Sequence, residues 1–483
     1  MPPDTPPATT LDAAPGPMHP AARRTLLAAI EAGWADPRRL HHDARRARGL
    51  LDQARAVVAD GLGARPEEVS FHAGGGSAAL ADALDGLSWP RRRTGRRVVT
   101  SAVEHSALLI PARYAAAQAG DPSLVAEVPV DRTGRVDLVA WRSAVAAPGT
   151  AVAALQAANG EVGTIQPVEE AYAECSAAAV PLLVDATASG GRLAVPAAYD
   201  ALVVDACSVA GPPVGVLAVR GRARFGRSGP MREAEFGRAD SAIWVPLALA
   251  AAEAWQQCAA QRERDNSEAR ALIERVRAAA AAIPDVDIAG DPVRRLPHIV
   301  TLSVLGLDGE TIVTELDRLG LGVASGSACT ASTLEPSHVL AAMGVLTHGN
   351  IRVTLPWEAV APHRAAAVGA LAVALPEVIA RLRGREGDGG RASVSEARTS
   401  ADVVTVDARG TRCPVPIIRI AAAARGLPAG TLVELLATDA ATSTDLSAWC
   451  RMRGHTVLGA EPMPPEGDSP TMRFTVCVGP APA

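Results

Sequence analysis

Apolar positions along the chain alternate between short continuous runs and longer stretches with helical spacing. Between residues 21 and 62, positions such as Leu26, Leu27 and Ile30 recur at helical intervals, which predicts helical structure. Val98–Thr100 and the run that ends at Asp185 are short and apolar, as is typical of buried strands. Because strand, helix and strand follow one another in this way, we expect an α/β fold with a mainly parallel sheet covered by helices.

The same pattern divides the chain into parts. The stretch from Leu249 to Ala282 is helical and Ala-rich, and residues 283–383 predict a smaller α/β unit. After Leu382 the sequence GREGDGGRASVSEARTSAD is polar and lacks apolar periodicity, which indicates a flexible linker. We therefore expect a first domain at 1–383 (a large part at about 18–260 and a small part at about 261–383), a linker at 384–401 and a separate domain at 402–483.

Composition excludes several classes of protein. The chain has 483 residues, of which 48% are hydrophobic, but we find no long uncharged apolar run and expect no membrane segment. The start, MPPDTPPATT, lacks the basic and apolar regions of an export signal. Seven cysteines without metal-ligand spacing fit a reducing cytoplasm and predict no metal site. A net charge of −5 gives no general indication of nucleic-acid binding.

The basic residues add one strong restriction. All 47 of them are arginine, and the sequence contains no lysine. Arginine stays protonated and cannot form a Schiff base with an aldehyde. The chain therefore has no side chain able to hold an aldehyde cofactor covalently in this way.

One segment carries a candidate nucleophile. GVASGSACTASTLEPSHVL, residues 322–340, places Cys329 among small residues, before a helix expected to start at Pro336 and to end before Gly344. Taken alone, this pattern is compatible with a buried structural cysteine and with a reactive one. Together with NIRVTLP, it resembles the active-site loop and the substrate-arginine strand of cysteine desulfurases, members of the class V aminotransferase family. The resemblance implies that Cys329 forms a persulfide and that Arg352 binds the substrate carboxylate.

This resemblance covers most of the chain and implies the type I fold of pyridoxal-phosphate-dependent transferases, in a homodimer. It also assigns a cofactor site. The Gly-rich turn in VSFHAGGGSAALADAL is the expected phosphate site, because backbone N–H groups at a helix start attract anions. The pattern by itself is equally compatible with a plain tight turn. The expected contacts that the sequence offers are Gly76 and Ser77 in this turn, His105 over the cofactor ring, Asp185 at the pyridine nitrogen, and Ser241.

Five side chains of the family's cofactor site are absent, the one at Gly76 among them, so the site is degenerate. Gly76 stands where the family has a threonine, Gly160 where it has an asparagine, and Ala188 where it has a glutamine. In DALVVDACSVAGPP, Cys207 replaces a histidine and Ser208 replaces the Schiff-base lysine. We therefore expect no covalently bound pyridoxal phosphate, while non-covalent binding stays open.

The residues after Val403 resemble a second family. VTVDARGTRCPVPIIRIAAAA predicts strand, turn and helix, with Cys413 at the helix start in the motif CPVP. This resembles the small α+β two-layer sulfur carriers of the TusA type, in which the CPxP cysteine carries a persulfide. The helix start and nearby Arg412 predict a stabilised thiolate. Further matches are Asp407, Gly410, Asp439, Asp445, Cys450, Gly454 and His455, whereas we interpret Cys175, Cys258 and Cys477 as packing residues and leave both interpretations open for Cys450.

Three functions follow from these two resemblances. The first is cytoplasmic sulfur trafficking, in which Cys329 relays sulfur from a donor, such as a true cysteine desulfurase, to Cys413 for a downstream acceptor protein; thiolate attack on a persulfide needs no pyridoxal phosphate. The second is cysteine desulfurase activity with non-covalent pyridoxal phosphate or with a lysine from a partner subunit. The third is a non-catalytic scaffold that docks a true desulfurase, but a scaffold would need neither Cys329 nor Arg352.

Overall fold

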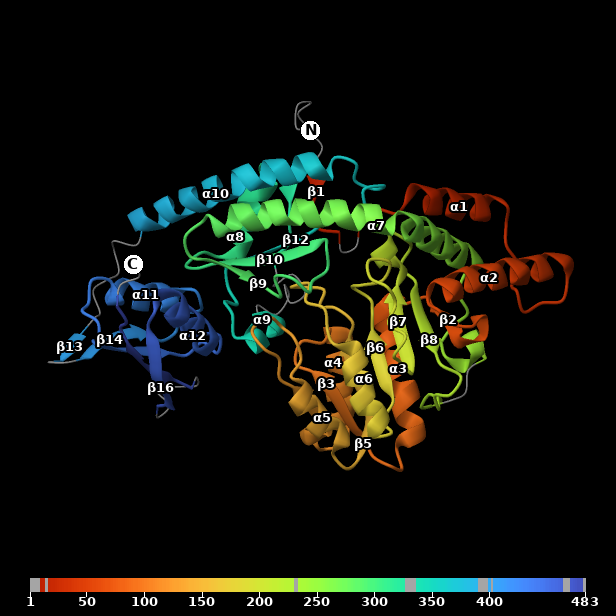
Figure 1. Ribbon diagram of the computed structural model, residues 1–483, viewed down its shortest axis with the longest axis horizontal. Coiled ribbons are helices and arrows are strands. Elements are labelled where there is room, and N and C mark those ends of the chain that lie inside the picture. The colour runs from red at the N-terminus through yellow and green to blue at the C-terminus, as the bar shows by residue number, and fades with distance from the viewer. Residues whose placement is uncertain are drawn as a thin grey trace.

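The computed structural model describes residues 9–13, 16–229, 233–325, 336–389, 398–400, 403–463 and 470–480. These residues form a large α/β domain, a small domain above it and a C-terminal domain at one side (Figure 1). The Cys329 segment lies outside the described residues.

The large domain contains a sheet of seven strands. All neighbours in the sheet run parallel except β8, which is antiparallel to β2 and β7. This confirms the expected mainly parallel sheet. In spatial order the strands are β2 (Val69–His72), β8 (Gly215–Val219), β7 (Ala201–Asp205), β6 (Leu182–Asp185), β5 (Thr150–Gln156), β3 (Arg97–Ser101) and β4 (Val125–Val128).

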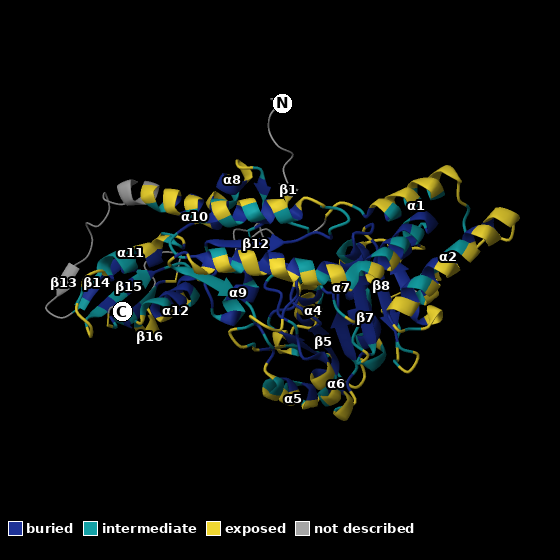
Figure 2. Ribbon diagram, turned by 45° about the horizontal axis from the view of Figure 1, so that its top comes forward, coloured by how far each residue is buried: buried dark blue, intermediate teal, exposed yellow. Residues whose placement is uncertain are grey.

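Helices cover both faces of this sheet. Leu80 and Leu108 lie in the apolar core on one face, whereas Trp141 and Ala171 lie in the core on the other. Every residue of β5 is buried as a result, and Figure 2 shows these central strands in dark blue beneath the helices. The first face is covered by α3 (Gly75–Ser88) and α4 (Ser106–Gln118), and the second by α2 (His42–Gly61), α5 (Leu138–Ala146), α6 (Val168–Ala177) and part of α7 (Val245–Ala281).

The helical stretch expected over residues 21–62 is two helices, because the chain turns between α1 (Pro20–Glu31) and α2. The long helix expected from Leu249 is α7, which has 37 residues and joins the large domain to the small one. Both helices of the pair pack against α7 at its large-domain end.

The small domain is built on an antiparallel sheet of three strands, β9 (Val286–Ala289), β10 (Ile299–Val304) and β12 (Asn350–Thr354). A two-stranded pair, β1 (Thr9–Thr10) and β11 (Leu321–Gly322), adds to it. The helix expected from Pro336 is α9 (His338–Met343), which begins two residues later and ends, as expected, before Gly344. The other helices of this domain are α8 (Gly309–Asp317) and α10 (Arg364–Gly389).

Helix α10 continues to Gly389, so the first part of the expected linker is helical. Within the described chain, its segment Arg364–Gly384 is the one stretch long and apolar enough to cross a membrane. However, the apolar side chains of Val368, Leu371, Leu375 and Ile379 pack in the core of the small domain. Figure 2 shows buried and exposed positions alternating along this helix.

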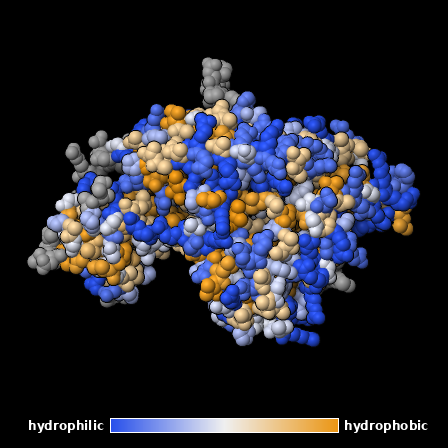
Figure 3. Space-filling model, viewed as in Figure 1, coloured by the Kyte–Doolittle hydropathy of each residue, from blue (hydrophilic) through white to orange (hydrophobic). Residues whose placement is uncertain are grey.

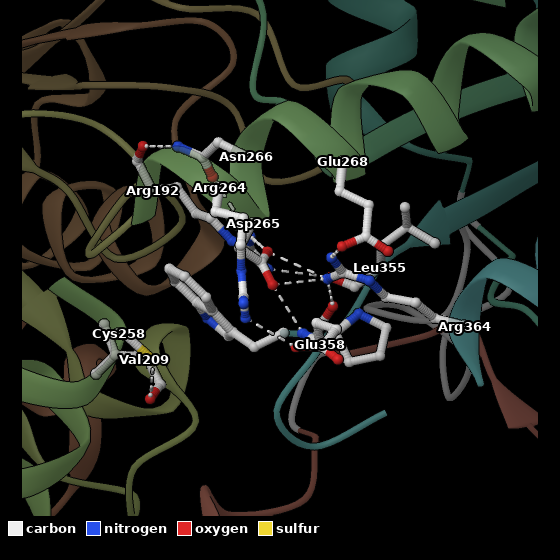
Figure 4. Close-up of polar contacts among 12 residues, drawn as sticks. Arg192, Val209, Cys258, Arg264, Asp265, Asn266, Glu268, Leu355, Glu358 and Arg364 are labelled. Carbon is white, nitrogen blue, oxygen red and sulfur yellow. Dashed lines mark hydrogen bonds and ion pairs between the residues drawn. The ribbon is translucent and has the colours of Figure 1, made fainter. Parts of the chain in front are cut away.

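A buried charge cluster fixes the large domain against the small one (Figure 4). Asp265 on α7 forms ion pairs with Arg192 of the large domain and with Arg364 of α10, and all three side chains are almost fully buried. The Arg192 guanidinium also stacks on the Trp357 ring, 3.7 Å from its centroid. Because removing one partner would leave a charge buried without compensation, this cluster ties the domains together.

The C-terminal domain has two layers. Its sheet runs in the order β13 (Arg398–Ser400), β14 (Val403–Ala408), β15 (Leu432–Ala437), β17 (Met472–Cys477) and β16 (Thr456–Pro462). In β14 and β15 every second residue is buried, and helices α11 (Val415–Ala424) and α12 (Thr442–Arg453) pack on that face. This confirms the expected small α+β domain. Figure 3 shows an open notch between this domain and the large domain on the face in view.

Candidate active site and carrier site

A cavity of about 540 Å³ lies between the large and small domains. It opens at the carboxyl ends of β5, β6 and β7, where open parallel sheets usually bind their ligands. Most of the predicted site residues line it, namely Gly76, Ser77, His105, Asp185, Ser208 and Arg352. Ser241 is exposed and is not among the lining residues.

The Gly-rich turn at the start of α3 is occupied by a carboxylate of the chain itself. The Gly76 N–H donates a hydrogen bond to Asp205 Oδ2 at 2.6 Å, and the Cys207 N–H donates to Asp205 Oδ1 at 2.8 Å. A Cβ atom on Gly76 would lie 2.9 Å from Asp205 Oδ2 and 2.8 Å from Thr187 Cγ2, so a larger residue would have to displace these side chains. The end of α3 that attracts anions is therefore already neutralised by Asp205.

Asp185 ends β6, as predicted, and turns toward a neighbouring threonine. Its Oδ1 accepts hydrogen bonds from the Thr187 N–H at 2.8 Å and from the Thr187 hydroxyl at 2.7 Å. Burial raises the pKa of Asp185, and the charge of Asp205 adds to this, against the opposing effects of Thr187 and His105. His105 is exposed at the start of α4, where its Nδ1 accepts a hydrogen bond from the Ala107 N–H at 3.1 Å and caps the helix.

The residue before His105, Glu104, has a strongly raised pKa. It is fully buried, and burial raises its pKa to about 8, with a further contribution from the charge of Asp185. The Gln156 N–H donates to its Oε1 at 3.1 Å, while its Oε2 has no hydrogen-bond partner among the described residues. Burial therefore favours the protonated form of Glu104. The family resemblance singled out His105 and not Glu104, because a sequence shows residue types and does not show burial.

The small domain contributes a cation to the cavity. Arg352 lies on β12, is only 9% exposed, and has its nearest paired carboxylate, Asp12, at 4.0 Å. Its Nε has no hydrogen-bond partner in the described part of the chain. Close by, burial raises the pKa of Glu161 to about 7, although hydrogen bonding to Ser337 and the charge of Arg352 act against this. Such a weakly paired, buried guanidinium fits an anionic group such as a carboxylate.

The position expected for a Schiff-base lysine holds a hydroxyl. Ser208 Oγ donates to the backbone oxygen of Asp205 at 2.6 Å, and the Trp357 indole N–H donates to the backbone oxygen of Ser208 at 2.9 Å. Beside it, burial and the charge of Asp205 raise the pKa of the Cys207 thiol to about 12. These contacts hold the segment in place without any amine.

The lining residues do not fit pyridoxal phosphate. The chain offers no lysine for the aldehyde, and the Asp205 carboxylate stands where the phosphate would need the N–H groups of α3. An anion brought to that position would meet a like charge instead of a free helix end. The residues of this chain alone therefore support no step through this cofactor.

The second predicted site, Cys413, lies at the start of α11. Its N–H donates to Asp439 Oδ2 at 2.7 Å, and its Sγ lies 3.7 Å from the Thr442 hydroxyl. The residue is only 8% exposed. Burial, together with the charges of Asp445 and Asp439, raises the pKa of the thiol strongly. The prediction of a stabilised thiolate is wrong for this arrangement, because burial beside two carboxylates outweighs the helix start and Arg412.

The small domain covers this site through the loop between α9 and β12. Asp445 of α12 accepts hydrogen bonds from the Thr347 N–H at 2.8 Å, from the Thr347 hydroxyl at 2.9 Å and from His348 Nδ1 at 2.7 Å. His348, Asp445 and Cys413 bring their polar atoms within 4.8 Å of one another. Sequence reasoning matched Asp445 to a motif but missed His348, which precedes the NIRVTLP strand and belongs to the other domain.

The other predicted packing cysteines and Cys450 differ in how far they are buried. Cys175 and Cys258 are buried in the large domain, where burial raises the pKa of each thiol to about 12. Cys450 is 2% exposed in the core of the C-terminal domain, and burial raises its pKa to about 12 as well. Cys477 is half-buried on β17. Cys450 is thus a packing residue in this arrangement.

Two families match the chain. The family described as aminotransferase class-V matches residues 12–224 and 241–358, and the family described as sulfurtransferase TusA matches residues 404–476. An IscS-like cysteine desulfurase of Mycobacterium tuberculosis is 35% identical over 390 residues, which covers 77% of this chain and 96% of that protein. The cysteine desulfurase NifS of Azotobacter vinelandii is 32% identical over 338 residues, covering 67% and 81%.

Solved structures agree in fold. A NifS-like protein superimposes with a TM-score of 0.69 at 22% identity over 77% of this chain and 99% of its own. DndA from Streptomyces lividans superimposes with a TM-score of 0.60 at 26% identity over 72% of this chain and 98% of its own.

Proposed function

Because this chain belongs to the class V aminotransferase family, is similar to cysteine desulfurases and carries a TusA domain, we propose that it relays sulfur from Cys329 to Cys413. In this proposal a donor protein, for example a true cysteine desulfurase, places sulfane sulfur on Cys329. Cys413 then passes it to an acceptor protein. We further propose that the protein works in the cytoplasm as a homodimer, as the family resemblance implies.

One observation carries this proposal: the C-terminal domain rests on the small domain through Thr347 and His348, just beyond α9. The N-terminal end of α9 lies at the cavity, where the His338 ring hydrogen-bonds to the Glu104 backbone oxygen at 2.9 Å. Its six residues span about 9 Å. Docking therefore keeps the carrier domain one short helix away from the cavity, and the transfer itself takes place after the domain leaves this contact. Cys329 precedes that helix in the chain.

The chemistry needs no cofactor. A Cys413 thiolate, formed by loss of its proton to solvent, attacks the outer sulfur of a Cys329 persulfide. The S–S bond of that persulfide breaks, Cys329 leaves as a thiolate, and the persulfide is now on Cys413. Nothing is oxidised or reduced overall, and attachment in one chain gives the two thiols a high effective concentration.

The test uses the full chain, a separate cysteine desulfurase and sulfur-labelled cysteine. Label should appear on Cys413, should be lost in Cys413→Ala, and should stay at the wild-type level in the packing controls Cys450→Ala and Cys477→Ala. Transfer to Cys413 should fall sharply in Cys329→Ala. Equal labelling of the C-terminal domain in Cys413→Ala would refute the carrier role, and undiminished labelling in Cys329→Ala would refute the relay.

Arg352 favours a second candidate, cysteine desulfurase activity completed by a partner's lysine. A buried, weakly paired guanidinium at the cavity is suited to a substrate carboxylate, and a scaffold would not need it. The test is production of alanine and sulfide from cysteine with added pyridoxal phosphate, for the chain alone and with a lysine-bearing desulfurase. Activity of the mixture above that of the desulfurase alone, lost in Arg352→Gln, would favour this candidate.

A further inference from the structure

The contact between the small domain and the C-terminal domain is centred on one buried carboxylate. Asp445 is 2% exposed and accepts its three interdomain hydrogen bonds from two adjacent residues, Thr347 and His348. The other described polar contacts across this boundary are peripheral. Arg453 pairs with Asp285 at 2.6 Å, and Arg451 donates to the Gly344 backbone oxygen, but both arginines lie nearer the surface.

Burial of Asp445 makes the contact depend on charge. A carboxylate removed from water is costly unless a cation or several donors compensate it. The Thr347 donors are neutral, so the compensating charge comes from His348, whose side chain is 25% exposed. The groups that face His348 are all acidic or neutral: Asp445 of α12, Asp439 before it, Asp308 before α8, and the Thr347 hydroxyl. This surrounding favours the imidazolium form.

The same contact covers the carrier cysteine, Cys413. Cys413 Sγ lies within 4.8 Å of the polar atoms of both Asp445 and His348, and the residue is 8% exposed. A thiol has to ionise and reach a second sulfur before it can exchange sulfur. In the docked arrangement Cys413 can do neither readily, since it is covered and its burial disfavours the thiolate.

We propose that Thr347 and His348 form a latch on Asp445 that holds the C-terminal domain against the small domain and shuts Cys413 away until the latch opens. The docked form is a protected state of the carrier thiol, and release of Asp445 exposes Cys413 to donor persulfides and, once it carries sulfur, to acceptor thiols. Residues 384–401 keep the released domain attached to the chain. The inference concerns the access of reagents to Cys413 and does not depend on which donor supplies its sulfur.

The test measures the alkylation rate of each cysteine in the full chain with iodoacetamide at a fixed neutral pH, by mass spectrometry of peptides. Removing the charged half of the latch in His348→Ala should speed alkylation of Cys413 by about tenfold or more, the factor expected from loss of one charge-assisted hydrogen bond. Thr347→Val should act in the same direction. His348→Asn retains a donor for Asp445 and should remain closer to the wild type than His348→Ala.

Two controls separate opening from unfolding. Cys450 lies in the core of the C-terminal domain, so its alkylation should stay slow in every variant. His42→Ala removes an exposed histidine far from the boundary, paired with Asp43 at 3.3 Å, and should leave Cys413 unchanged. An unchanged Cys413 rate in His348→Ala would overturn the proposal. An equal increase in the alkylation rate of Cys450 would overturn it too, because the C-terminal domain would then unfold instead of separating from the small domain.

Discussion

The Asp205 carboxylate accepts a hydrogen bond from the Gly76 N–H at 2.6 Å, so the start of α3 holds an anion that belongs to the chain itself. The two residues are 129 positions apart and meet because β7 delivers Asp205 to the end of β2 and the turn after it. This pair, and not the missing lysine alone, separates the cavity from a pyridoxal phosphate site.

Replacing Asp205 should therefore reopen the anion site. Two unit charges about 4 Å apart repel by roughly 1–4 kcal/mol near a protein surface, so Asp205→Ser should bind pyridoxal phosphate about tenfold or more tightly than the wild type. Equilibrium dialysis measures this without any catalytic activity. Asp121→Ser, which removes an exposed aspartate elsewhere in the large domain, is the control. Equal affinity in the wild type and Asp205→Ser would contradict the role of Asp205.

Borohydride trapping should find no cofactor in the region that the family uses. The chain has no lysine, and Ser208 cannot form an aldimine. After incubation with pyridoxal phosphate and reduction, peptides from residues 195–220 should be unlabelled in mass spectra. A labelled peptide from this region would show that the assignment of Ser208 is wrong.

Restoring the lysine should not restore the reaction. Ser208→Lys would place an ammonium in the cavity that Asp185 and Asp205 also line, which favours its protonated and unreactive form, while Gly160 and Ala188 still leave a cofactor ring poorly held. We expect no saturable production of alanine and sulfide from cysteine. Clear turnover by the single variant would mean that the rest of the pocket is intact.

Docking of the C-terminal domain should weaken as pH rises. Burial alone would lower the pKa of His348, but its hydrogen bond to Asp445 and the charges of Asp445, Asp439 and Asp308 raise it above the ordinary value. A raised pKa means that the docked state binds the proton more tightly than the open one. The stabilisation that His348 gives the docked state is therefore complete below a pH of about 6.5. It is lost as pH rises through the higher pKa that His348 has in the docked state.

Small-angle X-ray scattering checks the direction of this pH dependence by measuring the radius of gyration. The wild type should expand between pH 6 and the alkaline range, whereas His348→Asn should show no such dependence. Tighter docking at high pH would contradict the assignment of His348.

The buried cluster around Asp265 predicts a large effect on stability. Asp265→Ala would leave Arg192 and Arg364 buried without their shared carboxylate, which costs about 3–5 kcal/mol in the free energy of unfolding. Chemical denaturation measures this loss. Glu358→Ala, which removes the partner of the exposed Arg264, should cost less than about 1 kcal/mol. A loss of the same size in both variants would contradict the special role of the cluster.

Several features could be read from local patterns. Asp185 follows an apolar run, and its place at the carboxyl end of a buried strand brought it to the cavity as predicted. Gly344 ends α9 because its φ of 63° suits glycine, and the alternating burial of β14 and β15 follows their period-two pattern. These features depend on spacing within one element, and a sequence displays such spacing directly.

The lysine-free composition, the degenerate set of cofactor residues and the two family resemblances were likewise determined by the sequence alone. Only the tertiary structure decided that Asp205 fills the start of α3, that Glu104 is a buried acid, and that His348 and Asp445 join two domains over Cys413. The predicted Cys413 thiolate failed for this reason. A thiol's pKa depends on burial and on charges that distant segments bring near it, and no local pattern records either.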